Sequence, residues 1–437
     1  MVKLLIIADD FTGALDTGVL FAEKGAYTEV LNDINYDLSR IKERVEVLVM
    51  NAETRHCSAD EAYQRITAIG KRALGYGIAH IYKKTDSALR GNIAGELTAL
   101  LHVSGLNMLP FVPAFPKMNR ITVNGIHYID GVPVHQSVFG QDPFEPVTVS
   151  DIQKLINTQM DTPVQVVTRS NHPEKLLPDD KSKIYVFDAV TDEDMRKIAE
   201  GLKKKGNLRI MAGCAGFAEV LPEVLSLGGH ETIRPEINNN FLIVCGSVNP
   251  ITKEQIAYAC ENGFKRITLK PHQKLDKSYY STDEGRAFMM QLKQSCLAEK
   301  RLIMDTNDSM DTDDSKESGN AADTYTTLEY AKEKNLSLED VRLAISGTFG
   351  FIIKALIDEG LDSTMLITGG DTLLGFMNQF EDCKIVPVCQ METGVVLSEI
   401  DLNGDSFKIL SKSGGFGKRE LFVTLAENIV AKNMTKE

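Results

Sequence analysis

The sequence predicts an α/β protein of two domains, each built on a mostly parallel sheet flanked by helices. Short apolar runs, typical of strands buried on both faces, alternate with segments whose apolar residues recur at helical spacing. A polar stretch rich in Gly and Asn interrupts this alternation once, and a new apolar run restarts it. The length of 437 residues also exceeds that of one typical domain.

Composition and charge limit the classes of function. With 43% hydrophobic and 25% charged residues, the chain has the composition of an ordinary globular protein with a large core. A formal net charge of −13 argues against a nucleic-acid or anionic-membrane surface. No stretch is long and apolar enough to span a bilayer, and the N-terminus does not resemble a signal peptide. The 7 cysteines are scattered and the 8 histidines form no metal-like cluster, so we expect a reduced, cytoplasmic protein without a bound zinc.

The first predicted strand, Leu4 to Ala8, ends directly in two carboxylates, Asp9 and Asp10. An apolar, uncharged run of this kind is typical of a central strand in a parallel sheet. Thr12 is a residue type that can cap the helix that follows. Because ligands of open α/β sheets bind at the carboxyl ends of the strands, we expect a ligand beside the two aspartates.

The rest of the first domain continues the same alternation. The predicted strands are 45–50, 78–82, 108–112 and 184–187, and the predicted helices are 58–74, a helix after residue 91, and 192–205. One segment differs, because Asp130 and Gly131 form a turn pair between short apolar runs and so predict a β-hairpin over 127–134. We expect this hairpin to project as a flap instead of joining the sheet.

The polar stretch 229–240 is predicted to be the linker, which places an N-terminal domain at 1–228 and a C-terminal domain at 241–437. The strands predicted for the second domain are 241–245, 267–269, 301–304, 364–368 and 385–388. The acidic run 305–323 is most simply a solvated loop. Small residues at 346–350 lie within a helical pattern, so we expect them to permit close helix packing and not to hold a phosphate.

The segment from Lys83 to Asn92 concentrates cations, hydroxyls and a carboxylate where a strand ends and a helix begins. This composition suits an anionic ligand that is rich in hydroxyl groups. Arg90 could hold a carboxylate through a two-point fork, which Lys does less well. The structural alternative is that Asp86 or Ser87 caps the helix while the cations form surface ion pairs.

A loop stiffened by two prolines follows the strand 108–112 and carries two more cations, Lys117 and Arg120. Such a loop could form a wall of the same site, or it could be an ordinary rigid connection.

Three turns of the second domain contain glycine beside a hydroxyl residue, which lets a phosphate approach the backbone. Two of them lie between a predicted strand and the start of a helix, and none has the P-loop spacing GxxxxGK[ST]. The candidate nucleotide-binding residues in these turns are Ser247, Gly369, Gly370, Asp371, Thr372 and Gly414.

Taken in order, these motifs resemble the four-carbon acid sugar kinase family. The matching segments extend over nearly the whole chain: 8–14, 84–92, 113–125, 142–144, 215–218, 246–247, 369–372 and 413–417. The resemblance implies an N-terminal domain for the acid sugar, a C-terminal domain for ATP and an active site in the cleft between them. Ala88, Cys214 and Asn249 depart from the family pattern, which leaves the exact substrate open.

The implied reaction transfers the γ-phosphoryl group of ATP, with Mg²⁺, to the terminal (C4) hydroxyl of D-threonate. D-erythronate and 3-oxo-tetronate are the alternative acceptors. We predict Asp86 as the catalytic base and Lys84 as the cation that neutralises the transferring group. The residues predicted to bind the acid sugar are Asp9, Asp10, Arg90, Lys117 and Arg120. The expected partners are these small molecules, with no nucleic acid or membrane, and a homodimer is compatible with the sequence.

Two other classes compete with this prediction. An NAD-dependent dehydrogenase would also alternate strands and helices, but the first strand ends in two aspartates where G-x-G-x-x-G would bind the pyrophosphate. A sensor that binds acid sugar and nucleotide without turnover would share every binding residue. Release of ADP that depends on the acid sugar distinguishes the kinase from both.

Overall fold

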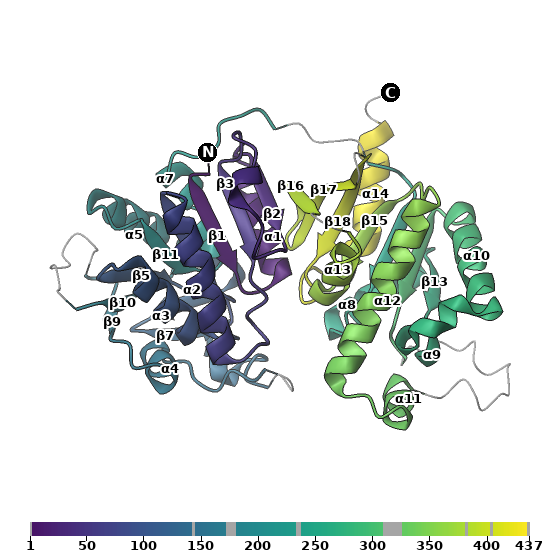
Figure 1. Ribbon diagram of the computed structural model, residues 1–437, viewed down its shortest axis with the longest axis horizontal. Helices are drawn as coiled ribbons and strands as arrows, with labels where there is room; N and C mark the ends of the chain where they lie inside the picture. Colours follow the sequence, from purple (N-terminus) through teal and green to yellow (C-terminus); the bar gives the residue numbers. More distant parts are fainter. Residues whose placement is uncertain are drawn as a thin grey trace. The chain divides into compact units, whose positions relative to one another are not determined.

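Strands and helices alternate through most of the described chain, which in the computed structural model comprises residues 2–141, 145–171, 181–232, 237–308, 326–380, 383–402 and 405–434. The chain divides into two units, of which the first contains the residues up to Thr232 together with Lys384–Cys389, and the second contains the remainder. Each unit has a mostly parallel sheet with helices against it, so the predicted α/β class is confirmed (Figure 1). The motif at 142–144 and most of the acidic run 305–323, from residue 309 onward, lie outside the described residues.

The sheet of the first unit has the order β2-β3-β1-β4-β11-β5-β10-β9, with all neighbouring strands parallel. Its strands are β1 (Leu4–Ala8), β2 (Thr28–Leu31), β3 (Val47–Asn51), β4 (His80–Lys84), β5 (Met108–Val112), β9 (Val164–Val167), β10 (Lys183–Phe187) and β11 (Ile210–Gly213). Its helices are α1 (Phe11–Ala22), α2 (Ala59–Gly75), α3 (Ile93–Ser104), α4 (Ile152–Gln159), α5 (Asp192–Lys204), α6 (Ala215–Ala218) and α7 (Leu221–Val224), with short 3₁₀ turns η1 (Leu38–Arg40), η2 (Pro116–Met118) and η3 (Val134–Gln136).

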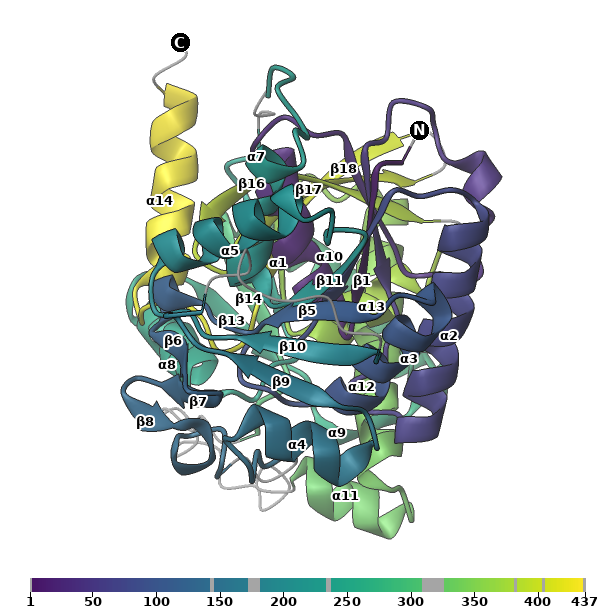
Figure 2. The same ribbon diagram turned by 90° about the vertical axis from the view of Figure 1, so that its left-hand side faces the viewer.

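β1 is buried along its whole length, as its apolar sequence predicts. Successive side chains of a strand point to opposite faces, and Leu5 and Ile7 therefore enter the same core cluster. That cluster also contains Ile66 of α2 and Leu97 of α3, two helices that lie side by side in Figure 2. The central position of β1 places the two aspartates that follow it at the middle of one sheet edge.

The predicted hairpin is present in a separate antiparallel sheet of β6 (Arg120–Val123), β7 (Ile126–Ile129) and β8 (Val132–Pro133). Asp130 and Gly131 adopt φ values of 50° and 82°, which a two-residue hairpin turn requires. The expectation of a projecting flap is wrong, however, because His127 of β7 is fully buried. Its Nε2 lies 2.9 Å from the carbonyl oxygen of Ser87, so the small sheet packs against the loop that follows β4.

The sheet of the second unit has the order β13-β14-β12-β15-β18-β17, parallel except for the antiparallel pair β17 and β18. Its strands are β12 (Phe241–Cys245), β13 (Lys265–Thr268), β14 (Arg301–Asp305), β15 (Thr364–Thr368), β17 (Val395–Leu402) and β18 (Asp405–Lys412). Its helices are α8 (Pro250–Glu261), α9 (Pro271–Leu275), α10 (Asp283–Ala298), α11 (Thr327–Glu333), α12 (Leu338–Asp358), α13 (Gly370–Met377) and α14 (Leu421–Met434), with the 3₁₀ turn η5 (Lys277–Ser281). None of the described helices is long and apolar enough to cross a membrane.

The division into units differs from the expected boundaries in two places. The strand β16 (Lys384–Glu392) begins in the first unit, because Lys384 and Ile385 pair antiparallel with β2. Residues 229–232 also belong to the first unit. The amide of Gly229 donates to the carbonyl of Lys24 at 2.8 Å, and the His230 ring lies 4.5 Å from that of Tyr27.

The small residues at 346–350 lie in α12 and permit close packing on α13, as expected. A Cβ atom at Gly350 would lie only 2.1 Å from the carbonyl oxygen of Gly375 in α13. We therefore expect Gly350→Ala to lower the free energy of unfolding by about 1–3 kcal/mol, measured by urea denaturation.

Gly347→Ala on the same helix is the matched control. Its Cβ would meet nothing closer than Lys277 Cε at 3.7 Å, so the variant gains helix propensity without a clash. Equal stability of the two variants would show that α12 and α13 can separate at no cost.

Candidate functional site

Four strands of the first unit end in register at one edge of the sheet. Ala8 of β1 pairs with Asn51 of β3 and with Lys84 of β4, and Lys84 pairs with Gly213 of β11. Residues that follow these strands therefore reach the same edge, although they are far apart in the sequence.

Arg55, from the loop after β3, joins three aspartates at this edge. Its Nε and Nη2 donate to Asp9 Oδ2 at 2.9 and 2.8 Å, and its Nη1 lies 2.6 Å from Asp10 Oδ2. Nη2 also lies 3.6 Å from Asp86 Oδ1. The sequence analysis missed Arg55, because a single cation in an otherwise unremarkable loop forms no motif. Its place just beyond a predicted strand, 45–50, was the signal that could have found it.

The two aspartates after β1 have different surroundings. Asp9 is only 2% exposed and lies 3.8 Å from Lys84 Nζ, and its Oδ1 accepts no hydrogen bond from the described residues. Burial raises the pKa of Asp9, but the charges of Arg55 and Lys84 outweigh that effect and hold it below the usual value. Asp10 has a side chain that is 24% exposed. Of the two, Asp10 is therefore the one that a ligand can reach.

Asp10 also caps α1, since its Oδ1 accepts the amide N–H of Gly13 at 2.7 Å. The expectation that Thr12 takes this role is wrong, because the helix already begins at Phe11.

Asp86 is held by Arg90 in a two-point ion pair. Nε and Nη2 of Arg90 donate to the two carboxylate oxygens at 2.9 and 3.0 Å, and the amide of Ala88 donates at 3.1 Å. Burial opposes ionisation, yet the charges of Arg90 and Arg55 hold the pKa of Asp86 well below its usual range. The alternative that Asp86 or Ser87 caps the next helix is wrong, because α3 begins after Asn92.

Arg120, at the start of β6, reaches the same loop from the small sheet. Its Nη1 donates to the hydroxyl of Ser87, and its guanidinium carbon lies 5.2 Å from the centre of the Phe139 ring. Arg90 lies at 5.2 Å from the same ring, so Phe139 has a guanidinium contact from both arginines. The Nε of Arg120 has no hydrogen-bond partner among the described residues, although the residue is only 9% exposed.

Lys117 is not joined to these residues by any described contact. Its side chain is 54% exposed, and its Nζ forms an ion pair with Glu219. Its predicted role in binding the acid sugar therefore gains no support from its contacts.

The charges at this edge do not balance. Among the groups joined by these contacts, four cations, Arg55, Lys84, Arg90 and Arg120, accompany three carboxylates, Asp9, Asp10 and Asp86. The neighbouring Lys83 and Glu96 pair with each other at 3.1 Å, and Asp130, which also acts on Arg120, is exposed to solvent. A buried charge without a partner is costly, and here the surplus is positive. The group of residues is therefore complementary to a ligand with one negative charge.

The second unit has a comparable edge. Cys245 of β12 pairs with Asp305 of β14 and with Thr368 of β15, and Thr368 pairs with Lys412 of β18. The three turns singled out from the sequence start at these strand ends, so the register brings them together.

Close contacts confirm that these turns meet. A Cβ at Gly246 would lie 2.1 Å from Thr372 Oγ1, and a Cβ at Gly414 would lie 2.7 Å from Ser247 Oγ. Gly369 has φ of 105°, a value that favours glycine, and precedes α13. The first amides of α13 lack partners within the helix, and with the nearby hydroxyls they form a donor set that suits a phosphate.

Gly370 is the first residue of α13. Asp371, which follows it, contacts residues that the sequence analysis did not predict for the site. Arg342 of α12 forms an ion pair with the Asp371 carboxylate, and Ser346 donates to the Asp371 carbonyl at 2.6 Å. Sequence reasoning also missed Lys412 and Asn307, which lie at this edge. The side-chain oxygen of Asn307, Oδ1, is buried without a hydrogen-bond partner among the described residues. Its side-chain nitrogen, Nδ2, lies 3.5 Å from the Ser247 carbonyl oxygen.

The described residues contain no group of three or more His, Cys, Asp or Glu side chains that could hold a metal ion. A Mg²⁺ ion that enters with a nucleotide needs only one or two protein oxygens, since phosphates and water supply the others. Asp371 and Thr372, consecutive residues at the start of α13, supply a carboxylate and a hydroxyl of the kind required.

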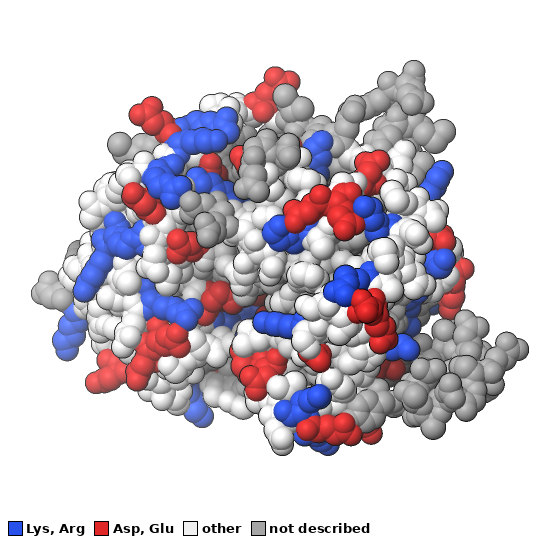
Figure 3. Space-filling model, turned by 45° about the vertical axis from the view of Figure 1, so that its right-hand side comes forward, with Lys and Arg blue, Asp and Glu red and all other residues white. Residues whose placement is uncertain are grey.

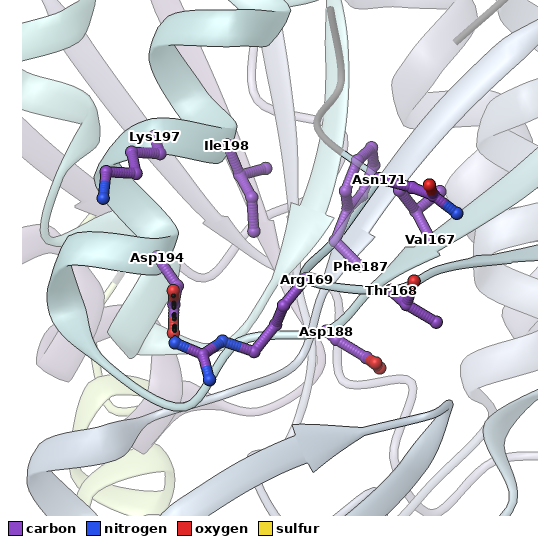
Figure 4. Close-up of a pocket in the computed structure, with 9 residues that line it drawn as sticks. All are labelled: Val167, Thr168, Arg169, Asn171, Phe187, Asp188, Asp194, Lys197 and Ile198. Carbon is purple, nitrogen blue, oxygen red and sulfur yellow. Dashed lines mark hydrogen bonds and ion pairs between the residues drawn. The ribbon is translucent and has the colours of Figure 1, made fainter. Parts of the chain in front are cut away.

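A small hollow lies at the ends of β9 and β10, and Figure 4 shows the side chains around it. Its polar groups have partners within the protein. Arg169 pairs with Asp194 at 3.1 Å, and Asp188 accepts the amides of Asn124 and Gly125 at 2.6 and 2.9 Å. On the face shown in Figure 3, acidic and basic side chains are interspersed, as on an ordinary protein surface.

Comparisons with known proteins match the two parts of the chain to two different domain families. A sugar-binding N-terminal domain model matches residues 4–221, and a nucleotide-binding C-terminal domain model matches residues 242–422. The chain is 28% identical to a D-threonate kinase of Salmonella typhimurium, over 95% of both proteins. It is 31% identical to a D-erythronate kinase of Heliobacterium modesticaldum, over 63% of this chain and 64% of the relative. It is also 25% identical to a 3-oxo-tetronate kinase of Escherichia coli, over 59% of this chain and 69% of the relative.

Two solved structures share the fold. A Salmonella typhimurium LT2 protein matches with a TM-score of 0.75 at 20% identity, over 97% of this chain and 98% of that chain. A Haemophilus influenzae protein matches with a TM-score of 0.69 at 20% identity, over 97% of this chain and 99% of that chain.

Proposed function

Because this chain belongs to the four-carbon acid sugar kinase family, we propose that it transfers the γ-phosphoryl group of ATP to the C4 hydroxyl of D-threonate. The observation that supports an acid as the acceptor is the surplus of one positive charge at the edge of the first unit. A tetronate carries one carboxylate and so balances it. The D-threonate kinase of Salmonella typhimurium is 28% identical over 95% of this chain, against 23% for a 3-oxo-tetronate kinase of Haemophilus influenzae over the same share, which supports D-threonate as the acceptor.

Arg120 and Ser87 bind the carboxylate of the acid sugar in this proposal. Arg120 has a free Nε donor and contacts the Ser87 hydroxyl, whereas the fork of Arg90 is already used by Asp86. Arg90 then stabilises the substrate carboxylate through its charge. Its fork can also release Asp86 and bind the substrate carboxylate directly. A two-point contact from Arg suits a carboxylate better than a Lys contact would.

Asp10 meets the C4 hydroxyl and accepts its proton as the bond to phosphorus forms. It is more exposed than Asp9, whose carboxylate faces Arg55 and Lys84. The sequence prediction that Asp86 is the base stays untested. The oxygens of both aspartates have partners within the protein, but the Asp86 side chain is only 9% exposed against 24% for Asp10, so a substrate hydroxyl reaches Asp10 more readily. Lys84 stabilises the charge of the transferring group, since phosphoryl transfer depends mainly on positioning and neutralisation.

ATP binds at the edge of the second unit, with its phosphates against Ser247, Gly414 and the first turn of α13. Mg²⁺ with Thr372 and Asp371 as protein ligands would neutralise the phosphates when it is bound. In-line transfer needs the acceptor hydroxyl beside the γ-phosphate. A shared cleft between the two domains is therefore a requirement of the proposal, and it stays a prediction.

A panel of acceptors tests the proposal through the release of ADP, measured with a coupled assay. D-threonate is expected to give the highest kcat/KM among D-threonate, D-erythronate and the two 3-oxo-tetronates. Threitol and erythritol have the hydroxyl groups but lack the carboxylate, so we expect their kcat/KM to be lower by about a hundredfold or more.

Turnover of threitol at the rate of D-threonate would contradict the role given to the surplus positive charge. A higher kcat/KM for D-erythronate or a 3-oxo-tetronate would replace D-threonate within the same family. Folded protein that releases no ADP with any of the four acids would overturn the proposed substrate class.

A further inference from the structure

Lys412, the last residue of β18, is a buried lysine at the edge that carries the predicted nucleotide turns. It is 2% exposed, and no carboxylate among the described residues pairs with it. Its Nζ instead donates to the carbonyl oxygens of Ser413 and Gly414 at 2.9 and 3.2 Å and lies 3.4 Å from Thr252 Oγ1. Burial lowers the pKa of Lys412 to about 8, and Cys245 is the titratable neighbour that acts in the opposite direction.

These contacts determine where the amides of the turn point. The described chain contains no cis peptide bonds, and in a trans peptide the C=O of one residue and the N–H of the next point in opposite directions. With the carbonyls of Ser413 and Gly414 directed at Nζ, the amides of Gly414 and Gly415 are directed away from it. Neither amide donates to an acceptor among the described residues.

The turn is also fixed against the start of α8. Thr252 donates through its hydroxyl to the Gly414 carbonyl at 2.6 Å. A Cβ at Gly414 would lie 2.7 Å from Ser247 Oγ, so the turn lies directly against the Ser247 hydroxyl. Successive unpaired amides beside a hydroxyl group form a concavity that binds anions.

We infer that Lys412 is a positioning residue that directs the amides of Gly414 and Gly415 toward a phosphate of the nucleotide. It acts through the turn and does not itself touch the ligand, because its three donors are used by the protein. This inference rests on the proposed function, and it assigns to the late glycine turn a specific donor role within it.

The test is Lys412→Met, which keeps most of the length of the side chain and removes both its donors and its charge. We expect the Kd for ADP, measured by calorimetry on the full chain, and the KM for ATP to rise about tenfold or more. The KM for the acid sugar, bound in the other unit, is expected to stay within about twofold. Thr252→Val keeps Lys412 but removes the hydroxyl that donates to the Gly414 carbonyl and contacts Lys412 Nζ and Ser247 Oγ, and we expect it to raise the same two constants by about threefold.

Lys274→Met is the matched control. Lys274 is also fully buried in the second unit, and its Nζ donates to the Thr306 carbonyl and the Thr327 hydroxyl at 2.8 and 2.6 Å. Unlike Lys412, it also forms an ion pair with a carboxylate, that of Asp308. We expect this variant to lose stability and to keep its Kd for ADP within about twofold of the wild type.

Folded Lys412→Met protein with wild-type affinity for ADP would overturn the inference. So would an equal loss of affinity in Lys274→Met, since that would show a general effect of losing a buried lysine. If Lys412→Met does not fold, a Thr252→Val variant with unchanged Kd overturns it in the same way. Wild-type protein that binds no adenine nucleotide would instead contradict the proposed function.

Discussion

Arg55→Met is expected to lower kcat/KM for the acid sugar about a hundredfold or more and to destabilise the protein by about 3–5 kcal/mol. Arg55 is the common partner of Asp9, Asp10 and Asp86, and its side chain is only 10% exposed. Removing it leaves carboxylates in a buried region without their main counter-charge. Steady-state kinetics measures the first effect and urea denaturation the second.

The loss of stability should depend on pH. In the wild type, the pKa values of Asp9 and Asp86 lie below the usual 3.8, because Arg55 and other cations outweigh burial. The stability that these carboxylates contribute is present above that value and is lost as the pH falls through their folded pKa values. Without Arg55, burial of Asp9 is less compensated and its pKa rises, so protonation relieves the strain at a higher pH. We therefore expect the difference between wild type and variant to be largest near neutral pH and smaller below pH of about 4.

Arg72→Met provides the control for a lost arginine in the same unit. Arg72 of α2 donates to the carbonyls of Ile34 and Tyr36 and has no contact with the three aspartates. This variant should lose stability and keep its KM for the acid sugar. An Arg55→Met protein with wild-type kinetics would show that the arrangement of the aspartates does not matter for activity.

Asp10→Asn is expected to lower kcat about a hundredfold or more with a small change in stability. Asn is as good a helix cap as Asp, so α1 keeps its capped start while the proton acceptor is lost. Single-turnover measurement of ADP formation at saturating ATP reports the chemical step directly.

Asp86→Asn distinguishes the two candidate bases. It breaks the two-point pair with Arg90, and if Asp86 is a positioning residue the main effect is a higher KM for the acid sugar. Near-normal kcat in Asp10→Asn together with a lost kcat in Asp86→Asn would reverse the assignment and support the sequence prediction.

Much of the fold could be predicted because its pattern is local. The strands β5, β12 and β15 have the predicted bounds, since each is a short apolar run that ends at a turn. The strands β2, β11 and β17 were missed, although they are well buried. Their runs are short or mixed, and they become strands because neighbouring strands pair with them, which a single segment does not reveal.

The candidate site divides in the same way. Turns that contain glycine beside a hydroxyl, such as Gly369 to Thr372, follow from residue type and spacing. Residue type and spacing alone did not reveal Arg55, which follows a predicted strand, or Lys412, which directly precedes the late glycine turn. Each gains its contacts only when parallel strands align their ends. The Arg120 contact with Ser87 likewise requires the small sheet to fold back on the loop after β4.

By itself, the sequence determined the α/β class, the two groups of loops at strand ends and the resemblance to the acid sugar kinases. These depend on apolar periodicity and on short motifs, which are properties of neighbouring residues. The tertiary structure alone decided that Asp10 is accessible while Asp9 is buried, and that Asp86 is held by Arg90. It also decided which cations surround the aspartates, because burial and ion pairing depend on distances between residues that are far apart in the chain.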